Sequence, residues 1–153
     1  MSRFEDDFEM TCMILCLLLS IGDALLALWK AEHGGNSDDL TLLINKAIIC
    51  SIAIQEECDN YMTNVGVLLR VKIALSIGKM QITHVGVTES KHFDLSGSAV
   101  SDVNAAEKWA EPGSIILSLL AFSNCDQSLF LFETIDNGMY YRVSCVRNGK
   151  LKK

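Results

Sequence analysis

Two apolar runs near the start of the sequence, residues 14–20 and 24–29, lie on either side of Ile21-Gly22-Asp23. A Gly-Asp pair between short apolar runs is typical of a β-hairpin turn, so this pattern predicts two antiparallel strands joined beside Asp23. Neither run alternates strictly between apolar and polar positions, which leaves a buried helix as the alternative. On the hairpin interpretation, a carboxylate lies at the tip.

A long amphipathic helix is predicted next, from Ser37 to about Cys58. Serine is a residue type that caps helix amino termini, and Asp38 and Asp39 place negative charge in the first turn, where the helix dipole favours it. Apolar residues then recur every three or four positions, with most polar residues on the other side. This spacing indicates a helix that packs one face against a core.

The period of the pattern changes to two after that helix. Residues 69–76 alternate between apolar residues and polar or small ones, and residues 80–87 continue the alternation beyond Gly78-Lys79. A glycine between two alternating runs predicts a second hairpin, with its turn at Gly78-Lys79.

Four further elements complete the chain. A short strand near residues 92–95 precedes a helix that starts near Ser98 and stops before Pro112, since proline and glycine commonly follow helix ends. Residues 114–120 form an apolar strand, and a last hairpin turns at Asp136-Asn137-Gly138. This order predicts an α+β fold, in which a largely antiparallel sheet has helices on one face.

Composition supports one compact domain. Of 153 residues, 50% are hydrophobic, 21% are charged and one is a proline, a balance that excludes a disordered tail or a repeat array. The net charge of −6 excludes a broad basic face for nucleic acid, so no nucleic-acid partner is expected. The apolar run at residues 12–22 is too short to cross a bilayer, so we expect no membrane span.

The cysteines and the amino-terminal residues bear on the cellular compartment. Six cysteines are too few for a disulfide scaffold and none forms a CxxC pair, so we expect reduced, mostly buried thiols. The chain has no N-glycosylation sequon, and its first residues are too acidic for a signal peptide. These features predict a cytoplasmic protein.

Few residues are candidates for chemistry. The sequence has no nucleophile elbow and no glycine-rich phosphate loop, which disfavours hydrolase, P-loop and Rossmann chemistry. Asp23 is the main candidate, since a carboxylate held between two dry strands is a suitable ligand for a hard divalent cation. A solvated Gly-Asp turn is the alternative that the local pattern allows.

Residues 21–29, with the sequence IGDALLALW, resemble the second metal-binding hairpin of class III adenylate and guanylate cyclase catalytic domains. The similarity is to the first catalytic half of soluble adenylyl cyclases in particular, whose motif reads Phe-Ala-Gly-Asp-Ala-Leu-Leu-Ala-Leu-Trp. It continues in order through residues 69–78, which resemble a family strand, residues 97–103, which resemble the start of a family helix, and residues 114–118. Chance is a poor explanation for four such segments at compatible spacings.

The resemblance implies a nucleotide cyclase fold of ferredoxin-like type and an adenylate cyclase activity. In that family, two aspartates hold two Mg²⁺ or Mn²⁺ ions over ATP, which is converted to cyclic AMP, a signalling molecule, with release of pyrophosphate. Asp23 matches the second of these metal ligands. Lys72 lies where first halves have a basic residue near the triphosphate, although a solvated strand lysine is an equal alternative. The implied partner is a second cyclase half or a second copy of the chain.

The sequence departs from the family at several positions. No segment matches the strand and helix that contain the first metal aspartate, and Asp6 and Asp7 are no substitute because that strand, glycine turn and helix are missing around them. Leu19 and Asn104 replace two cations near the phosphate and bicarbonate sites. Ser101 and Ala105 replace the transition-state asparagine and arginine, which in pseudo-dimeric cyclases come from the other half. No catalytic residue is therefore assigned.

These departures predict a divergent leader at residues 1–13 and an incomplete cyclase domain at residues 14–153 that lacks the first strand and helices and is inactive as an isolated chain. One alternative is a non-catalytic cyclase-homology module for dimerisation or regulation, since a sheet without its first strand exposes an edge prone to pairing. Another is a sequence that misses an upstream segment encoding the absent motif.

Overall fold

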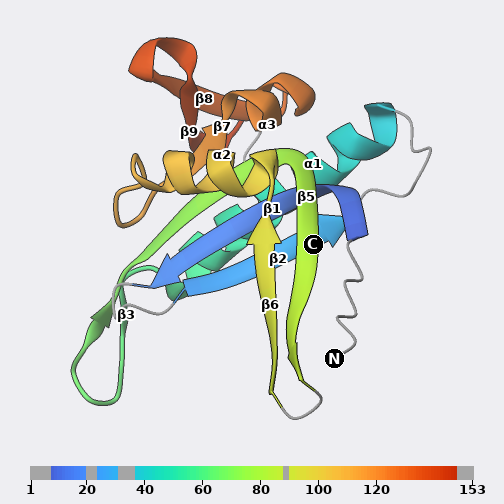
Figure 1. Cartoon of the computed structure of the whole chain (residues 1–153). Helices are drawn as coiled ribbons and strands as arrows, with labels where there is room; N and C mark the ends of the chain where they lie inside the picture. The colour runs from blue at the N-terminus through green and yellow to red at the C-terminus, as the bar shows by residue number, and fades with distance from the viewer. Residues whose placement is uncertain (1–7, 20–23, 31–36, 88–89, 148–153) are drawn as a thin grey trace.

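The computed structural model describes residues 8–19, 24–30, 37–87 and 90–147, and Figure 1 shows their arrangement. The elements in chain order are β1 (Phe8–Leu19), β2 (Ala24–Lys30), α1 (Ser37–Cys58), β3 (Tyr61–Met62), β4 (Leu68–Leu69), β5 (Val71–Val87), β6 (Ser90–Ser96), α2 (Ser98–Glu107), β7 (Ile115–Ser118), α3 (Leu119–Asn124), β8 (Phe130–Ile135), the 3₁₀ turn η1 (Asp136–Gly138) and β9 (Tyr140–Val146). One seven-stranded sheet has the order β2-β1-β5-β7-β9-β8, with β6 paired to β5, while β3 and β4 form a separate hairpin. Among the described strands, only β5 and β7 pair in parallel. The predicted α+β class with a largely antiparallel sheet is thus confirmed.

The first two apolar runs are strands rather than a buried helix. β1 and β2 pair antiparallel, with Met13 opposite Trp29 and Leu18 opposite Ala24, so the predicted hairpin is confirmed in its two strands. β1 already begins at Phe8, inside the segment predicted to be a leader. The boundary between residues 13 and 14 stays a prediction.

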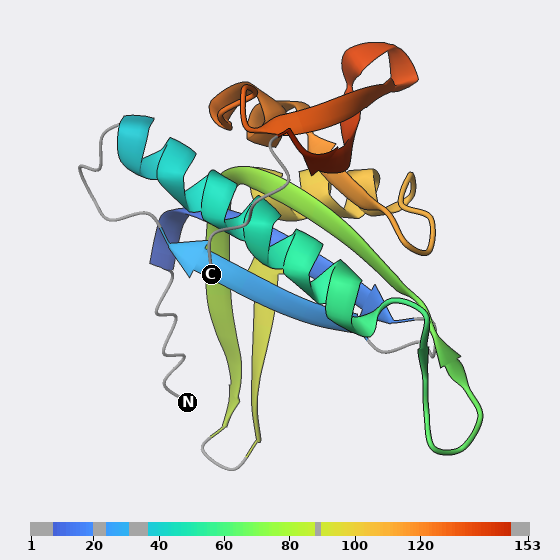
Figure 2. The same cartoon turned by 180° about the vertical axis from the view of Figure 1, so that it is seen from behind.

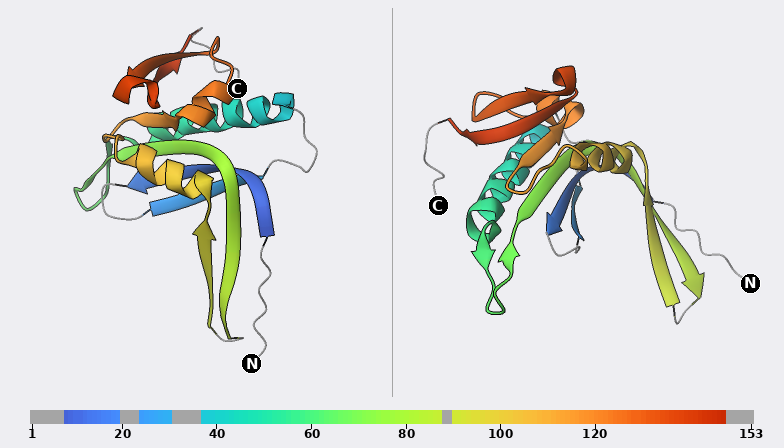
Figure 3. Two further views of the ribbon diagram at one scale, coloured as in Figure 1. Left: turned by 45° about the horizontal axis from the view of Figure 1, so that its top comes forward. Right: turned by 90° about the vertical axis from the view of Figure 1, so that its left-hand side faces the viewer.

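The predicted turn at Gly78-Lys79 is wrong. β5 runs without interruption through both residues, pairs with β1 across Gly78, and turns only after Val87 into β6. Gly78 serves a close approach instead, because a Cβ at this position would lie 2.6 Å from Ser98 Oγ and 3.0 Å from the amide nitrogen of Ala99. The glycine therefore lets the first turn of α2 touch the middle of a long, curved strand (Figure 3).

Helices cover both faces of β5, not the one face that the pattern predicts. Ile73 and Leu75 pack against α1, whereas Ala74 packs against α2 on the opposite face. Figures 1 and 2 show the two helices on opposite sides of the sheet. The small side chains of Ala74 and Ser76 permit this packing, and the Ser76 hydroxyl donates to the carbonyl oxygen of Ala99 over 2.6 Å. Ala74 and Ser76, on the polar or small side of the alternation, are therefore buried.

The later elements follow the prediction with shifted ends. The helix begins at Ser98 but ends at Glu107, and the strand after Pro112 ends at Ser118, whose hydroxyl accepts from the amide of Ala121 and caps α3. The last hairpin, β8 and β9 around η1, is confirmed. No helix in the described part of the chain is both long and apolar enough to cross a membrane.

The cysteines are less buried than predicted. Of the thiols that the structure describes, Cys50 and Cys145 are exposed, Cys58 is half-buried and Cys125 is buried. All four are free. Burial raises the pKa of the Cys125 thiol to about 11, so this group stays protonated at neutral pH.

Candidate functional site

The tip of the first hairpin, where the sequence predicts the metal ligand Asp23, lies outside the residues that the structure describes. The strands beside it are described. β2 begins at Ala24, opposite Leu18 of β1, and Leu18 is also opposite Lys72 of β5. The ends of the two hairpin strands therefore lie beside the first residues of β5, which places the backbone next to Asp23 in the same part of the sheet as Lys72.

Lys72 is held in an ion pair. Its ammonium group donates a hydrogen bond to a carboxylate oxygen of Glu107, the last residue of α2. The two side chains are only 31% and 27% exposed, so the pair is partly shielded from water. Lys72 is thus neither fully solvated, as one interpretation of the sequence has it, nor unpartnered.

Sequence reasoning missed the role of Glu107. The residue lies on the same stripe of α2 as Val103 and Ala106, and a carboxylate on an otherwise apolar stripe is the signal that points to a buried partner. Lys72 is 35 positions away in the sequence, and only the packing of α2 on β5 identifies it as that partner.

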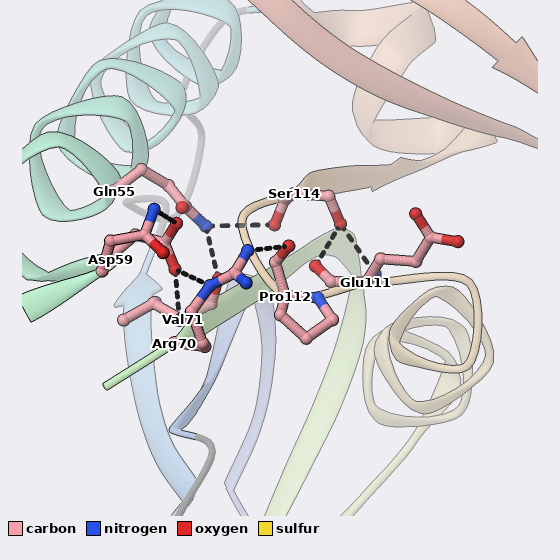
Figure 4. Close-up of polar contacts among 8 residues, drawn as sticks. Gln55, Asp59, Arg70, Val71, Glu111, Pro112 and Ser114 are labelled. Carbon is pink, nitrogen blue, oxygen red and sulfur yellow. Dashed lines mark hydrogen bonds and ion pairs between the residues drawn. The ribbon is translucent and has the colours of Figure 1, made fainter. Parts of the chain in front are cut away.

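A second ion pair fixes the residues just before Lys72. One carboxylate oxygen of Asp59, in the turn after α1, accepts from Arg70 Nε over 3.1 Å and from the amide of Val71 over 2.9 Å. The Arg70 guanidinium also donates to the carbonyl oxygen of Pro112 over 2.9 Å, as Figure 4 shows. The arginine therefore joins the end of α1, the start of β5 and the loop before β7.

Gln55 strengthens the same junction from the last turns of α1. Its amide nitrogen donates to the carbonyl oxygens of Val71 over 2.9 Å and of Ser114 over 3.2 Å (Figure 4). The Val71 carbonyl also accepts from the amide of Gly113 over 2.7 Å, and the Ser114 carbonyl accepts from the amide of Ile73 over 2.9 Å. These bonds hold the first residues of β5 in register with β7 and so fix the backbone on both sides of Lys72.

The described residues do not provide a metal site. Among them, no three side chains of His, Cys, Asp or Glu lie close enough together to hold one ion. The two carboxylates bonded to the start of β5 are both in ion pairs: Asp59 with Arg70, and Glu107 with Lys72. Binding of Mg²⁺ or Mn²⁺ at Asp23 stays a prediction.

The positions at which the sequence departs from the family lie on two elements. Ser101, Asn104 and Ala105 are on α2, where the Ser101 hydroxyl donates to the carbonyl oxygen of Gly97 over 3.3 Å. Leu19 is the last residue of β1. Neither the serine nor the alanine has the amide or guanidinium group that the family resemblance implies at these positions.

Solved structures identify the class of fold. The guanylate cyclase domain of RhGC from Catenaria anguillulae, solved in complex with GTP, matches with a TM-score of 0.73 at 15% identity, over 92% of this chain and 100% of that one. The adenylyl cyclase CyaB from P. aeruginosa matches with a TM-score of 0.61 at 11% identity, over 94% of this chain and 98% of that one. The fold is that of a class III cyclase catalytic domain.

A comparison of sequences shows homology as well as a shared fold. Adenylate cyclase type 10 of Oryctolagus cuniculus is 32% identical over 131 residues, which make up 86% of this chain and 8% of that protein. No protein-family model matches the chain. The chain is homologous to adenylate cyclase type 10 over these residues and has the catalytic-domain fold of the class III nucleotidyl cyclases, as the hairpin motif predicts. It spans only a small part of its relatives' length.

Proposed function

We propose that this chain forms one half of a nucleotidyl cyclase site that converts ATP to cyclic AMP and pyrophosphate. The homology to adenylate cyclase type 10 over 86% of the chain is the observation that supports this most directly. The choice of ATP over GTP follows that relative, because solved domains described as guanylate and as adenylyl cyclases both share the fold. The free thiols and the absence of a sequon favour the cytoplasm as its location.

Two residues have roles in this proposal. Asp23 is a ligand of Mg²⁺ or Mn²⁺ and Lys72 contacts the triphosphate, as the family resemblance implies. When bound, the cation offsets charge on the α-phosphate and activates the attacking ribose hydroxyl. The strand register supports a shared site, since Leu18 is opposite both Ala24 and Lys72. The hydrogen bonds of Gln55 and Asp59 to Val71 also support this site. They hold the backbone beside Lys72 in place, and a residue that binds phosphate needs such a rigid support.

The chain needs a partner half for turnover. Its sequence has one match to the two metal aspartates, and Ser101 and Ala105 stand where the family has its transition-state asparagine and arginine. With one metal aspartate, charge on the α-phosphate is poorly offset. We therefore expect no cyclic AMP from the purified chain with ATP and Mg²⁺ or Mn²⁺, and a low but measurable rate when a second catalytic half of a soluble adenylyl cyclase is added. That half supplies the asparagine and arginine but not the unmatched metal aspartate.

Mass spectrometry of the nucleotide products, together with light scattering of the mixture, tests this expectation. Clear cyclic AMP formation by the chain alone contradicts the need for a partner. A stable complex of the two halves that makes no cyclic AMP contradicts the catalytic proposal and favours a non-catalytic module.

That second candidate is supported by the edge of the sheet. β2 is an edge strand among the described strands, and Leu25, Leu26 and Leu28 on it are 57%, 38% and 38% exposed. An apolar strand edge is a template for another chain, so we expect the protein to form dimers at micromolar concentration.

Light scattering checks this, with Leu25→Lys expected to favour the monomer and Leu42→Lys, which changes a leucine 54% exposed on α1, to leave the dimer intact. A wild-type protein that is monomeric at all concentrations removes the support for this candidate.

A further inference from the structure

Lys72, the residue proposed to contact phosphate, is already in an ion pair with the carboxylate of Glu107. Lys72 lies on β5 and Glu107 ends α2, and the two side chains are each about one-third exposed or less. An ion pair that is partly shielded from water is screened less than one on an open surface. A phosphate group that approaches Lys72 therefore meets an ammonium whose charge is already partly balanced.

The end of α2 adds to this effect. The carbonyl end of a helix has a partial negative charge. The last turn of α2 contains no basic residue, and Lys108 follows as its C-cap. Lys72 reaches this end from the neighbouring strand. Glu107 and the helix end thus attract the same ammonium group, and both oppose an incoming anion.

Neither partner is free to move away as a whole. The start of β5 is fixed by Asp59 and Gln55. The second half of α2 is fixed by Val103 and Ala106, which are buried in the same core cluster as Ala74 of β5. Only the side chains of Lys72 and Glu107 can rearrange. An ammonium has three donors, so Lys72 either leaves Glu107 for the phosphate or bonds to both, and in the second case the two anions repel each other at close range.

From this arrangement we infer that Glu107 sets the phosphate affinity of the site by competing with the nucleotide for the Lys72 ammonium. This inference rests on the proposed contact between Lys72 and the triphosphate. It makes Glu107 an affinity-determining residue that does not itself need to touch the substrate. Loss of its negative charge is expected to strengthen anion binding, whereas loss of Lys72 weakens it.

The test measures binding of inorganic triphosphate and of ATP to the full chain by calorimetry at low and at high salt. Glu107→Gln is expected to bind triphosphate about two- to fivefold more tightly than the wild type, the range that one partly exposed ion pair supports. The gain is expected to shrink in high salt and to be absent in the Lys72→Met background. Glu111→Gln is the matched control: it removes the same charge from a residue that pairs with Arg142, 3.5 Å away, and should leave affinity unchanged.

The outcomes separate this inference from the proposal beneath it. Unchanged or weaker binding by Glu107→Gln, with weaker binding by Lys72→Met, overturns the role of Glu107 and leaves the role of Lys72 standing. A gain that persists without Lys72 also overturns it. Lys72→Met that binds as tightly as wild type, or no binding by any variant, overturns both. Glu107→Ala is a second variant, and circular dichroism confirms that each protein is folded.

Discussion

Gly97→Ala is expected to lower the free energy of unfolding by about 3 kcal/mol, a large share of the stability of a domain this size. Gly97 has φ of 118° and ψ of 175°, a region almost restricted to glycine. A Cβ there would lie 2.4 Å from the carbonyl oxygen of Lys79 and 3.1 Å from the Cα of Met80. Both are backbone atoms of a strand that is paired along its length, so strain and steric clash add together.

Urea unfolding followed by circular dichroism measures this change, as a shift of the midpoint with little change of slope. Gly66→Ala is the matched control, because Gly66 also has a positive φ, 79°, but nothing lies within 4 Å of its added Cβ. We expect this variant to lose about 1 kcal/mol, from backbone strain alone. If the two variants lost the same free energy of unfolding, steric clash between α2 and β5 would not be the reason that position 97 needs glycine.

Asp23→Asn is expected to reduce cyclic AMP formation by the chain and its partner half about 100-fold, since a metal ligand in such a site supplies several kcal/mol of charge stabilisation. Asparagine keeps the size and one oxygen of the side chain but loses the negative charge that Mg²⁺ favours in its ligands. The residual rate is expected to recover partly at high Mn²⁺ concentration, because weaker metal binding is then offset by mass action.

Asp136→Asn controls for the loss of one negative charge. Asp136 is exposed in η1 with φ of 47°, a conformation that asparagine also adopts, and it belongs to the last hairpin rather than the first. This variant should retain wild-type activity. If the Asp23→Asn complex retained at least half of the wild-type activity, Asp23 would not be a metal ligand.

Local sequence signals predicted most elements of the fold. The first and last hairpins follow from apolar runs around Gly-Asp and Asp-Asn-Gly, and α1 follows from helical spacing behind Ser37, because each signal acts over a few neighbouring residues. Gly78 misled the prediction because the same residue type serves turns and close approaches. Only the first turn of α2, 2.6 Å from an added Cβ, distinguishes the two uses.

The candidate site divides in the same way. The motif around Asp23 is contiguous, so the sequence displays it directly, and the resemblance adds Lys72. The groups that hold the site are distant in the sequence: Glu107 is 35 residues from Lys72, and Gln55 is 59 residues from Ser114. Nothing in the local pattern of either segment names its partner.

By itself, the sequence determined that the chain has cyclase ancestry, an α+β layout and one candidate metal carboxylate, since motif, period and turn chemistry are local properties. The tertiary structure alone decided that α2 covers the second face of β5, that Lys72 is paired with Glu107, and that Asp59 and Gln55 clamp the start of the strand. The first two outcomes depend on the small residues Ala74 and Ser76, which let α2 approach the face of β5 opposite to α1. Packing between distant segments, rather than the pattern along the chain, therefore sets the charge around Lys72.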